Sequence, residues 1–145
     1  MKIKVLIIED KITDYNFIEA GLKLAKTKSF ELCKINLPDL INGIKQNDGI
    51  SKIPNDIDLF IIDVSLEKGP DELGLRFLIE LKLKYQRPFK YIVASLWDKS
   101  EYESDIEIDD KIFINKQNYQ GFELKLKIRN TINNLDLGES IFNLK

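Results

Sequence analysis

The chain has 145 residues, of which 43% are hydrophobic and 32% are charged, and this length and composition fit one globular domain with a sizeable core. Its formal net charge of −2 excludes a general electrostatic attraction to nucleic acid or to an anionic membrane. Uninterrupted apolar stretches extend over only four residues, whereas a helix that spans a bilayer needs about 20. We therefore expect neither nucleic acid nor a membrane as a partner.

The chain contains no histidine and a single cysteine, Cys33. Catalytic triads with histidine and zinc sites with histidine ligands are therefore excluded, and Cys33 cannot form an internal disulfide. A chain without disulfides and without a secretory signal fits the reducing cytoplasm, which is the location we expect. Any chemistry must come from carboxylates, hydroxyls and lysines.

Four elements are predicted in the first part of the chain. Residues 4–8 form a continuous apolar run that is typical of a buried strand, and acids follow it. Residues 14–26 place apolar side chains at helical spacing, with Thr13 as the N-cap. Residues 32–37 alternate apolar and polar side chains, which favours an edge strand with one face in water. Pro38 then opens a short helix.

The rest of the chain continues the alternation of strands and helices. Strands are predicted at 57–62, 91–96 and 112–114, and helices at 75–83, 97–110 and 122–135. The helix at 97–110 is acidic and only weakly periodic. Five strands that alternate with helices imply right-handed βαβ units and a parallel sheet covered on both faces. With 32–37 at an edge, the pattern predicts an α/β flavodoxin-like, doubly wound sheet of order 2-1-3-4-5.

In such a sheet, the carboxyl ends of the parallel strands meet at one edge, where ligands bind. Polar side chains lie at or just after the ends of the predicted strands at that edge: Glu9, Asp10, Asp63, Ser95 and Lys116. Clustered carboxylates repel one another and raise each other's pKa unless a cation neutralises them. Mg²⁺ suits this cluster because it prefers carboxylate oxygens, water and phosphate oxygens as ligands.

These residue types fit a phosphoryl-transfer site, which needs a nucleophile, a metal ion and donors for the phosphoryl oxygens. Asp63 is the candidate nucleophile and would form an aspartyl phosphate. Asp10, helped by Glu9, would hold Mg²⁺. Ser95 would donate a hydrogen bond to one phosphoryl oxygen, and Lys116 would place its positive charge against another.

The order of these residues resembles the receiver domain of two-component response regulators. The resemblance rests on four motifs at the predicted strand ends: Val5-Leu-Ile-Ile-Glu-Asp10, Leu59-Phe-Ile-Ile-Asp-Val-Ser-Leu66, Tyr91-Ile-Val-Ala-Ser95 and Lys111-Ile-Phe-Ile-Asn-Lys116. It covers nearly the whole chain. We therefore expect a receiver domain at 1–135 and a short C-terminal tail at 136–145, with no output domain.

The resemblance implies that Asp63 accepts a phosphoryl group from a sensor histidine kinase or a histidine phosphotransfer protein. It also implies that the backbone carbonyl of Ser65 is a further Mg²⁺ ligand. Phosphorylation would draw Ser95 toward the phosphate and turn Phe113 inward. The face made by the fourth helix, the fifth strand and the fifth helix would then change its affinity for a downstream protein. The resemblance implies a signalling phosphoacceptor rather than an enzyme, with only self-phosphorylation and self-dephosphorylation chemistry.

Three positions depart from the pattern of that family. Gln117 stands where a proline usually follows the lysine, Leu96 stands where a small residue is usual, and Phe113 lacks a hydroxyl. Two alternatives therefore stay open. One is a degenerate receiver that binds partners without phosphorylation. The other is a phosphatase of the haloacid-dehalogenase type, although residues 63–65 lack the second aspartate of its Asp-x-Asp motif.

Overall fold

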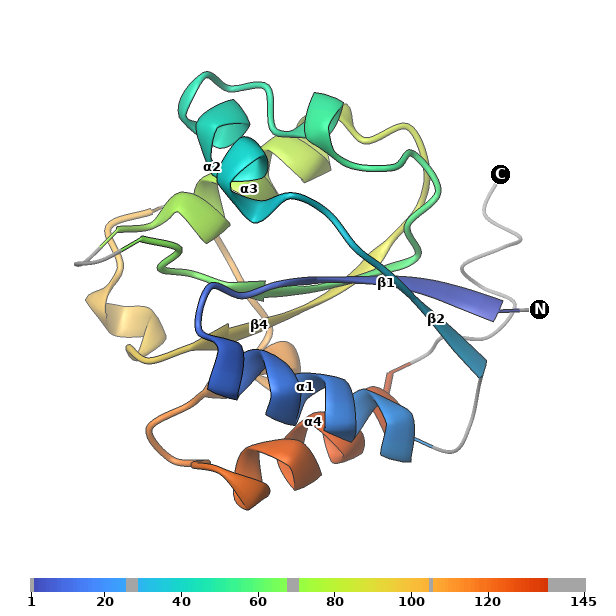
Figure 1. The fold of residues 1–145 in the computed structure, drawn as a ribbon. Helices are drawn as coiled ribbons and strands as arrows, with labels where there is room; N and C mark the ends of the chain where they lie inside the picture. Colours follow the sequence, from blue (N-terminus) through green and yellow to red (C-terminus); the bar gives the residue numbers. More distant parts are fainter. Residues whose placement is uncertain (1, 26–28, 68–70, 105, 136–145) are drawn as a thin grey trace.

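The computed structural model describes residues 2–25, 29–67, 71–104 and 106–135 (Figure 1). The strands are β1 (Lys2–Ile8), β2 (Ser29–Cys33), β3 (Leu59–Asp63), β4 (Lys90–Ser95) and β5 (Phe113–Asn115). The α-helices are α1 (Ile12–Leu24), α2 (Leu37–Lys45), α3 (Leu73–Lys84) and α4 (Phe122–Asn133). Short 3₁₀ turns are η1 (Ile50–Lys52), η2 (Lys99–Glu101) and η3 (Asp110–Ile112). The tail predicted at 136–145 lies outside the described residues.

The five strands form one parallel sheet in the order β2-β1-β3-β4-β5. Helices α1 and α4 cover one face of this sheet, and α2 and α3 cover the other (Figure 1). The molecule therefore has the α/β flavodoxin-like fold that the alternation of elements predicts. Because the strands are parallel, their carboxyl ends lie at the same edge.

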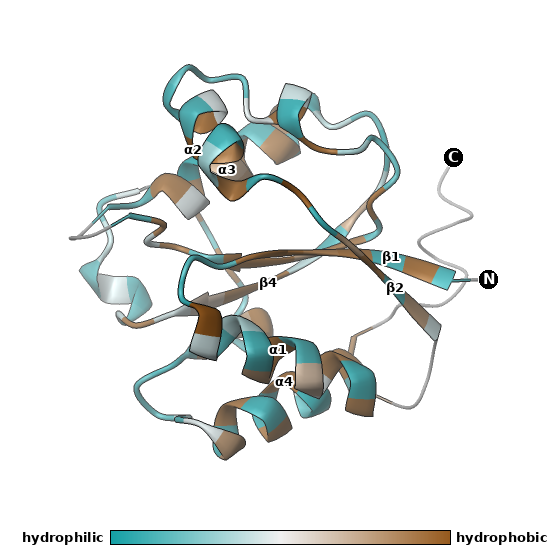
Figure 2. Cartoon of the chain, viewed as in Figure 1, coloured by the Kyte–Doolittle hydropathy of each residue, from teal (hydrophilic) through white to brown (hydrophobic). Residues whose placement is uncertain are grey.

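Burial on both faces explains why β1 is apolar almost throughout. Successive side chains of a strand point to opposite faces of the sheet. Ile3, Val5 and Ile7 belong to the core beneath α1 and α4, whereas Leu6 and Ile8 belong to the core beneath α2 and α3. Figure 2 shows this hydrophobic layer along β1 and β4 in the middle of the molecule. Among the described residues, no helix combines the length and the apolar character needed to cross a membrane.

Helices α1 and α4 pack directly against each other beside the sheet (Figure 1). Gly21 lies at their contact, where a Cβ would be 2.5 Å from the Lys125 carbonyl oxygen and 2.8 Å from the Ile128 Cβ. No side chain fits in this space, so the glycine permits the close approach of the two helices. This packing holds α1 in place next to the carboxyl end of β1.

The first helix and the second strand are displaced from their predicted positions. Helix α1 begins at Ile12, so Thr13 lies inside the helix and the prediction of Thr13 as N-cap was wrong. Strand β2 ends at Cys33, because the Asn36 side chain caps α2 and Leu37 is already its first residue. The prediction of this strand as a sheet edge is confirmed.

The helix predicted at 97–110 is wrong. The described part of this segment contains only the 3₁₀ turns η2 and η3 and irregular backbone. Short acidic side chains stabilise these local turns: Glu101 accepts a hydrogen bond from the Asp98 N–H at 2.9 Å, and Asp109 accepts one from the Lys111 N–H at 2.9 Å. The partner face expected from a fourth helix, fifth strand and fifth helix therefore lacks its first member, and α4 is the helix predicted at 122–135.

Candidate functional site

The carboxyl edge of the sheet brings the predicted site residues together. Asp63 is the last residue of β3, and Ser95 is the last residue of β4. Glu9 and Asp10 directly follow β1, and Lys116 directly follows β5. The apolar side chains within the strands are buried in the core. The polar residues at the carboxyl ends of the strands are therefore the ones available to form a site.

Lys116 lies among three carboxylates. Its Nζ donates hydrogen bonds to Glu9 Oε1 at 2.7 Å and to Asp14 Oδ2 at 3.0 Å, and it lies 3.5 Å from Asp63 Oδ2. The Lys116 side chain is only 3% exposed, so these carboxylates replace the water that an ammonium needs. Burial by itself lowers the pKa of Lys116, but the charges of Glu9 and Asp63 outweigh burial and raise it above its ordinary value.

The acidic residues fit a hard divalent cation. Glu9, Asp10 and Asp63 each place a carboxylate oxygen within 4.8 Å of the others. Among the described residues, Lys116 is the only cation that pairs with Glu9, Asp14 and Asp63. Carboxylates therefore outnumber positive charges at this site. Burial and the neighbouring Glu9 raise the pKa of Asp63 to about 9, and burial also raises the pKa of Glu9. Oxygen ligands with excess negative charge are those that Mg²⁺ prefers.

Ser95 is fully buried at the end of β4. Its Oγ accepts a hydrogen bond from the Trp97 N–H at 3.0 Å, and its carbonyl oxygen accepts one from the Lys116 N–H at 2.6 Å. The serine is thus tied through its backbone to the residue that carries the site ammonium. Leu96, which stands where receiver domains usually have a small residue, is 44% exposed.

Phe113 is the first residue of β5, and Gln117 lies in the turn that follows the strand. Phe113 is half-buried and packs against the core beneath α2 and α3, with the Lys99 Nζ 6.0 Å from its ring centroid. The Gln117 N–H donates to Asn115 Oδ1 at 2.9 Å, which closes the turn after β5 without a proline. The glutamine therefore does not prevent Lys116 from meeting the carboxylates.

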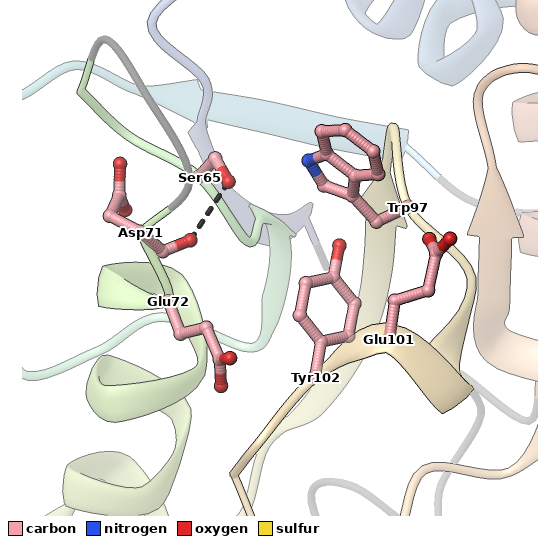
Figure 3. A pocket seen from close by; sticks show the side chains of 6 residues that line it. All are labelled: Ser65, Asp71, Glu72, Trp97, Glu101 and Tyr102. Atoms are coloured by element: carbon pink, nitrogen blue, oxygen red, sulfur yellow. Dashed lines mark hydrogen bonds between the residues drawn. The ribbon is translucent and has the colours of Figure 1, made fainter.

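Asp71 organises the loop that follows the candidate nucleophile. Its carboxylate accepts hydrogen bonds from three backbone N–H groups, at 3.0 Å from Leu66, 2.9 Å from Glu67 and 3.1 Å from Leu73. The Ser65 Oγ donates to the Asp71 carbonyl oxygen at 2.8 Å (Figure 3). These bonds hold Ser65, whose carbonyl is the expected metal ligand, in one position.

The sequence pattern did not indicate Asp71 or Asp14 as site residues. Each acid lies at or just before the first turn of a helix, where acids are common because they complement the helix dipole. Residue type alone therefore does not separate them from ordinary surface acids. The only available signal was their short separation from Asp10 and Asp63 along the chain.

A pocket of about 280 Å³ opens beside this loop (Figure 3). It is lined by Ser65, Asp71, Glu72, Trp97, Glu101 and Tyr102. The Glu72 carboxylate joins its two walls by accepting hydrogen bonds from the Glu103 and Ser104 N–H groups, each at 2.9 Å. The Tyr102 hydroxyl is buried and has no hydrogen-bond partner among the described residues. Burial and the nearby Asp63 charge raise the pKa of this phenol.

Comparison of the chain with protein-family models, with curated proteins and with solved structures finds no significant match. The fold and the site therefore define the class. This is a flavodoxin-like α/β protein with a buried lysine and a carboxylate cluster at the carboxyl edge of its sheet. The resemblance to receiver domains stays a hypothesis based on the site residues.

Proposed function

We propose that this protein is a response-regulator receiver that accepts a phosphoryl group on Asp63 with the help of Mg²⁺. The observation that supports this proposal most strongly is the Lys116 ammonium, which lies 3.5 Å from Asp63 Oδ2 beside the carboxylates of Glu9 and Asp10. A phosphoacceptor site needs a nucleophilic oxygen, a place for a metal ion and a positive charge for the phosphoryl oxygens. Candidates for all three lie at this edge of the sheet.

In the proposed reaction, an Asp63 carboxylate oxygen attacks the phosphorus of a phosphohistidine on the donor protein. The new P–O bond forms as the P–N bond breaks, and the bonding electron pair returns to the imidazole nitrogen. Lys116 would stabilise the negative charge of the phosphoryl oxygens. Ser95, whose Oγ accepts from the Trp97 N–H, would donate its hydroxyl hydrogen to another phosphoryl oxygen. Hydrolysis of the aspartyl phosphate would release inorganic phosphate and restore the carboxylate.

The candidate metal ligands are Glu9, Asp10, Asp63 and the backbone carbonyl of Ser65. Bound Mg²⁺ would supply positive charge that offsets the charge of the incoming phosphoryl group. Asp63 must be ionised to act as the nucleophile. Burial and the neighbouring Glu9 raise the pKa of its carboxyl, and bound Mg²⁺ would oppose this by favouring the ionised form.

The phosphohistidine of the proposed reaction would lie outside these 145 residues, because they contain no histidine. A sensor histidine kinase or a histidine phosphotransfer protein in the cytoplasm would fill this role. The surface that changes on phosphorylation would involve β5, α4 and the segment containing η2, in place of the helix expected there. A downstream protein would recognise that surface.

Incubation with Mg²⁺ and acetyl phosphate tests the proposal. We expect the intact mass of the wild-type protein to increase by one phosphoryl group, and Asp63→Asn to show no increase. Asp39→Asn, which neutralises an exposed acid on α2, is the matched control and should behave like wild type. An unmodified wild-type protein would favour the degenerate receiver, and sustained turnover of small phosphate esters would favour the phosphatase.

A further inference from the structure

Asp14 is an additional carboxylate at the site, and no role in phosphoryl transfer accounts for it. It lies in the first turn of α1, and its Oδ2 accepts a hydrogen bond from Lys116 Nζ at 3.0 Å. Lys116 Nζ is also bonded to Glu9 Oε1 at 2.7 Å, whereas Asp63 Oδ2 is farther away at 3.5 Å. In this state the ammonium is therefore directed to Glu9 and Asp14 rather than to the proposed acceptor.

The position of Asp14 is maintained by the packing of α1. Ile18 and Leu22 are buried in the core beneath α1 and α4, and Gly21 allows α1 to contact α4 closely. The Asp14 side chain is 17% exposed, so water screens its charge only partly. A phosphoryl group on Asp63 would bring further negative charge toward the same ammonium, and Asp14 would both repel it and compete for Lys116.

From this geometry we infer that Asp14 is a positioning residue that competes with the Asp63 side for Lys116 and thereby disfavours the phosphorylated state. A phosphoryl group on Asp63 would then have to share the three N–H donors of Lys116 with Glu9 and Asp14. Asp14 limits how much of the protein is phosphorylated at a given donor supply. This inference deepens the proposed function and depends on it.

Beryllofluoride, which mimics a phosphoryl group on a carboxylate, measures this competition in the presence of Mg²⁺. Trp97 is the single tryptophan of the chain and follows Ser95 closely, so its fluorescence reports binding. Asp14→Asn removes the charge and keeps the size and one acceptor oxygen. We expect this variant to bind beryllofluoride about 3- to 10-fold more tightly than wild type, as the loss of one nearby charge implies.

Two variants control for charge and for helix stability. Asp14→Glu retains the charge and should bind beryllofluoride within about twofold of wild type. Glu19→Gln removes a charge from the same helix, where Glu19 pairs with the largely exposed Lys23 at 3.8 Å, and should also bind like wild type. A purely structural role of Asp14 would lower the melting temperature of Asp14→Asn without tightening binding.

The outcomes separate this inference from the proposed function. The role of Asp14 is supported if Asp14→Asn binds beryllofluoride more tightly than wild type and the two control variants do not. Equal or weaker binding by Asp14→Asn, beside a normal wild-type response, overturns the role of Asp14 and leaves the phosphoacceptor proposal intact. No response of the wild-type protein to beryllofluoride and Mg²⁺ overturns both.

Discussion

Gly74 packs directly on the backbone of Asp63. A Cβ at Gly74 would lie 2.8 Å from the Asp63 carbonyl carbon and 2.9 Å from the Val64 Cα, and closer still to the Asp63 carbonyl oxygen. The Gly74 N–H also donates to the Val64 carbonyl oxygen at 2.8 Å. The first turn of α3 is thus pressed against the end of β3, and this contact positions both the candidate nucleophile and the loop that carries Ser65.

Gly74→Ala should destabilise the protein. Alanine has the higher helix propensity by about 1 kcal/mol, but the new methyl group would overlap backbone atoms that cannot rotate away. We expect a net loss of about 1–3 kcal/mol in the free energy of unfolding, measured by denaturant titration. Leu83→Ala, at an exposed position of the same helix, should change it by less than about 0.5 kcal/mol. Equal stability of the two variants would contradict the steric argument.

Asp71→Ala should weaken Mg²⁺ binding without removing a ligand. The substitution deprives three backbone N–H groups of their acceptor and frees the loop around Ser65. Loss of such a supporting contact lowers metal affinity by about 10-fold or more, which a calorimetric titration would measure. Glu67→Ala removes an acid of the same loop that pairs with Lys45 at 2.7 Å, and serves as the control. Equal affinities of the two variants would show that the loop does not position a ligand.

Glu80→Ala tests a structural carboxylate far from the site. Glu80 is buried on α3 and accepts hydrogen bonds from the Gly49 N–H at 3.0 Å and the Ile50 N–H at 2.8 Å. Its removal leaves both donors unpaired, so we expect a loss of about 2–4 kcal/mol in the free energy of unfolding. Asn42→Ala, at an exposed position of α2, should leave stability nearly unchanged. A small effect of Glu80→Ala would mean that water replaces the carboxylate.

The stability of the metal-free protein should depend on pH through Asp63. The pKa of its carboxyl is about 9 in the fold and 3.8 ordinarily, so between these values the folded state holds a proton that the unfolded chain has lost. Stability therefore falls as pH rises through this window, by at most about 1.4 kcal/mol per pH unit. Denaturant titrations at about pH 6 and about pH 8.5 would measure the difference.

Asp63→Asn and Mg²⁺ provide the controls for this pH dependence. Asp63→Asn cannot ionise, so its stability should vary less with pH than that of wild type. Mg²⁺ should stabilise the wild-type protein more at the higher pH, because metal ligands must be deprotonated. A wild-type stability that does not fall between the two pH values would show that Asp63 is already ionised in the metal-free fold.

The sheet order and much of the site were predictable because they depend on local patterns. Continuous apolar runs indicate strands buried on both faces, and their alternation with helices leaves few topologies. The polar residue that ends each run then lies at the carboxyl edge, which is where Glu9, Asp10, Asp63 and Lys116 meet. Residue order along the chain is sufficient for this inference, since parallel strands share one direction.

Contacts between distant segments were decided by the tertiary structure. Asp14 meets Lys116 because the packing of α1 on the sheet and on α4 places the first turn of α1 beside the end of β5. The segment after β4 forms turns rather than a helix. Its apolar residues are only weakly periodic, and acids such as Asp109 accept local backbone hydrogen bonds that stabilise turns instead. The apolar periodicity of the sequence therefore predicts which edge of the sheet holds the acids. The contact of Asp14 with Lys116 could not be predicted, because it depends on how helices pack in three dimensions.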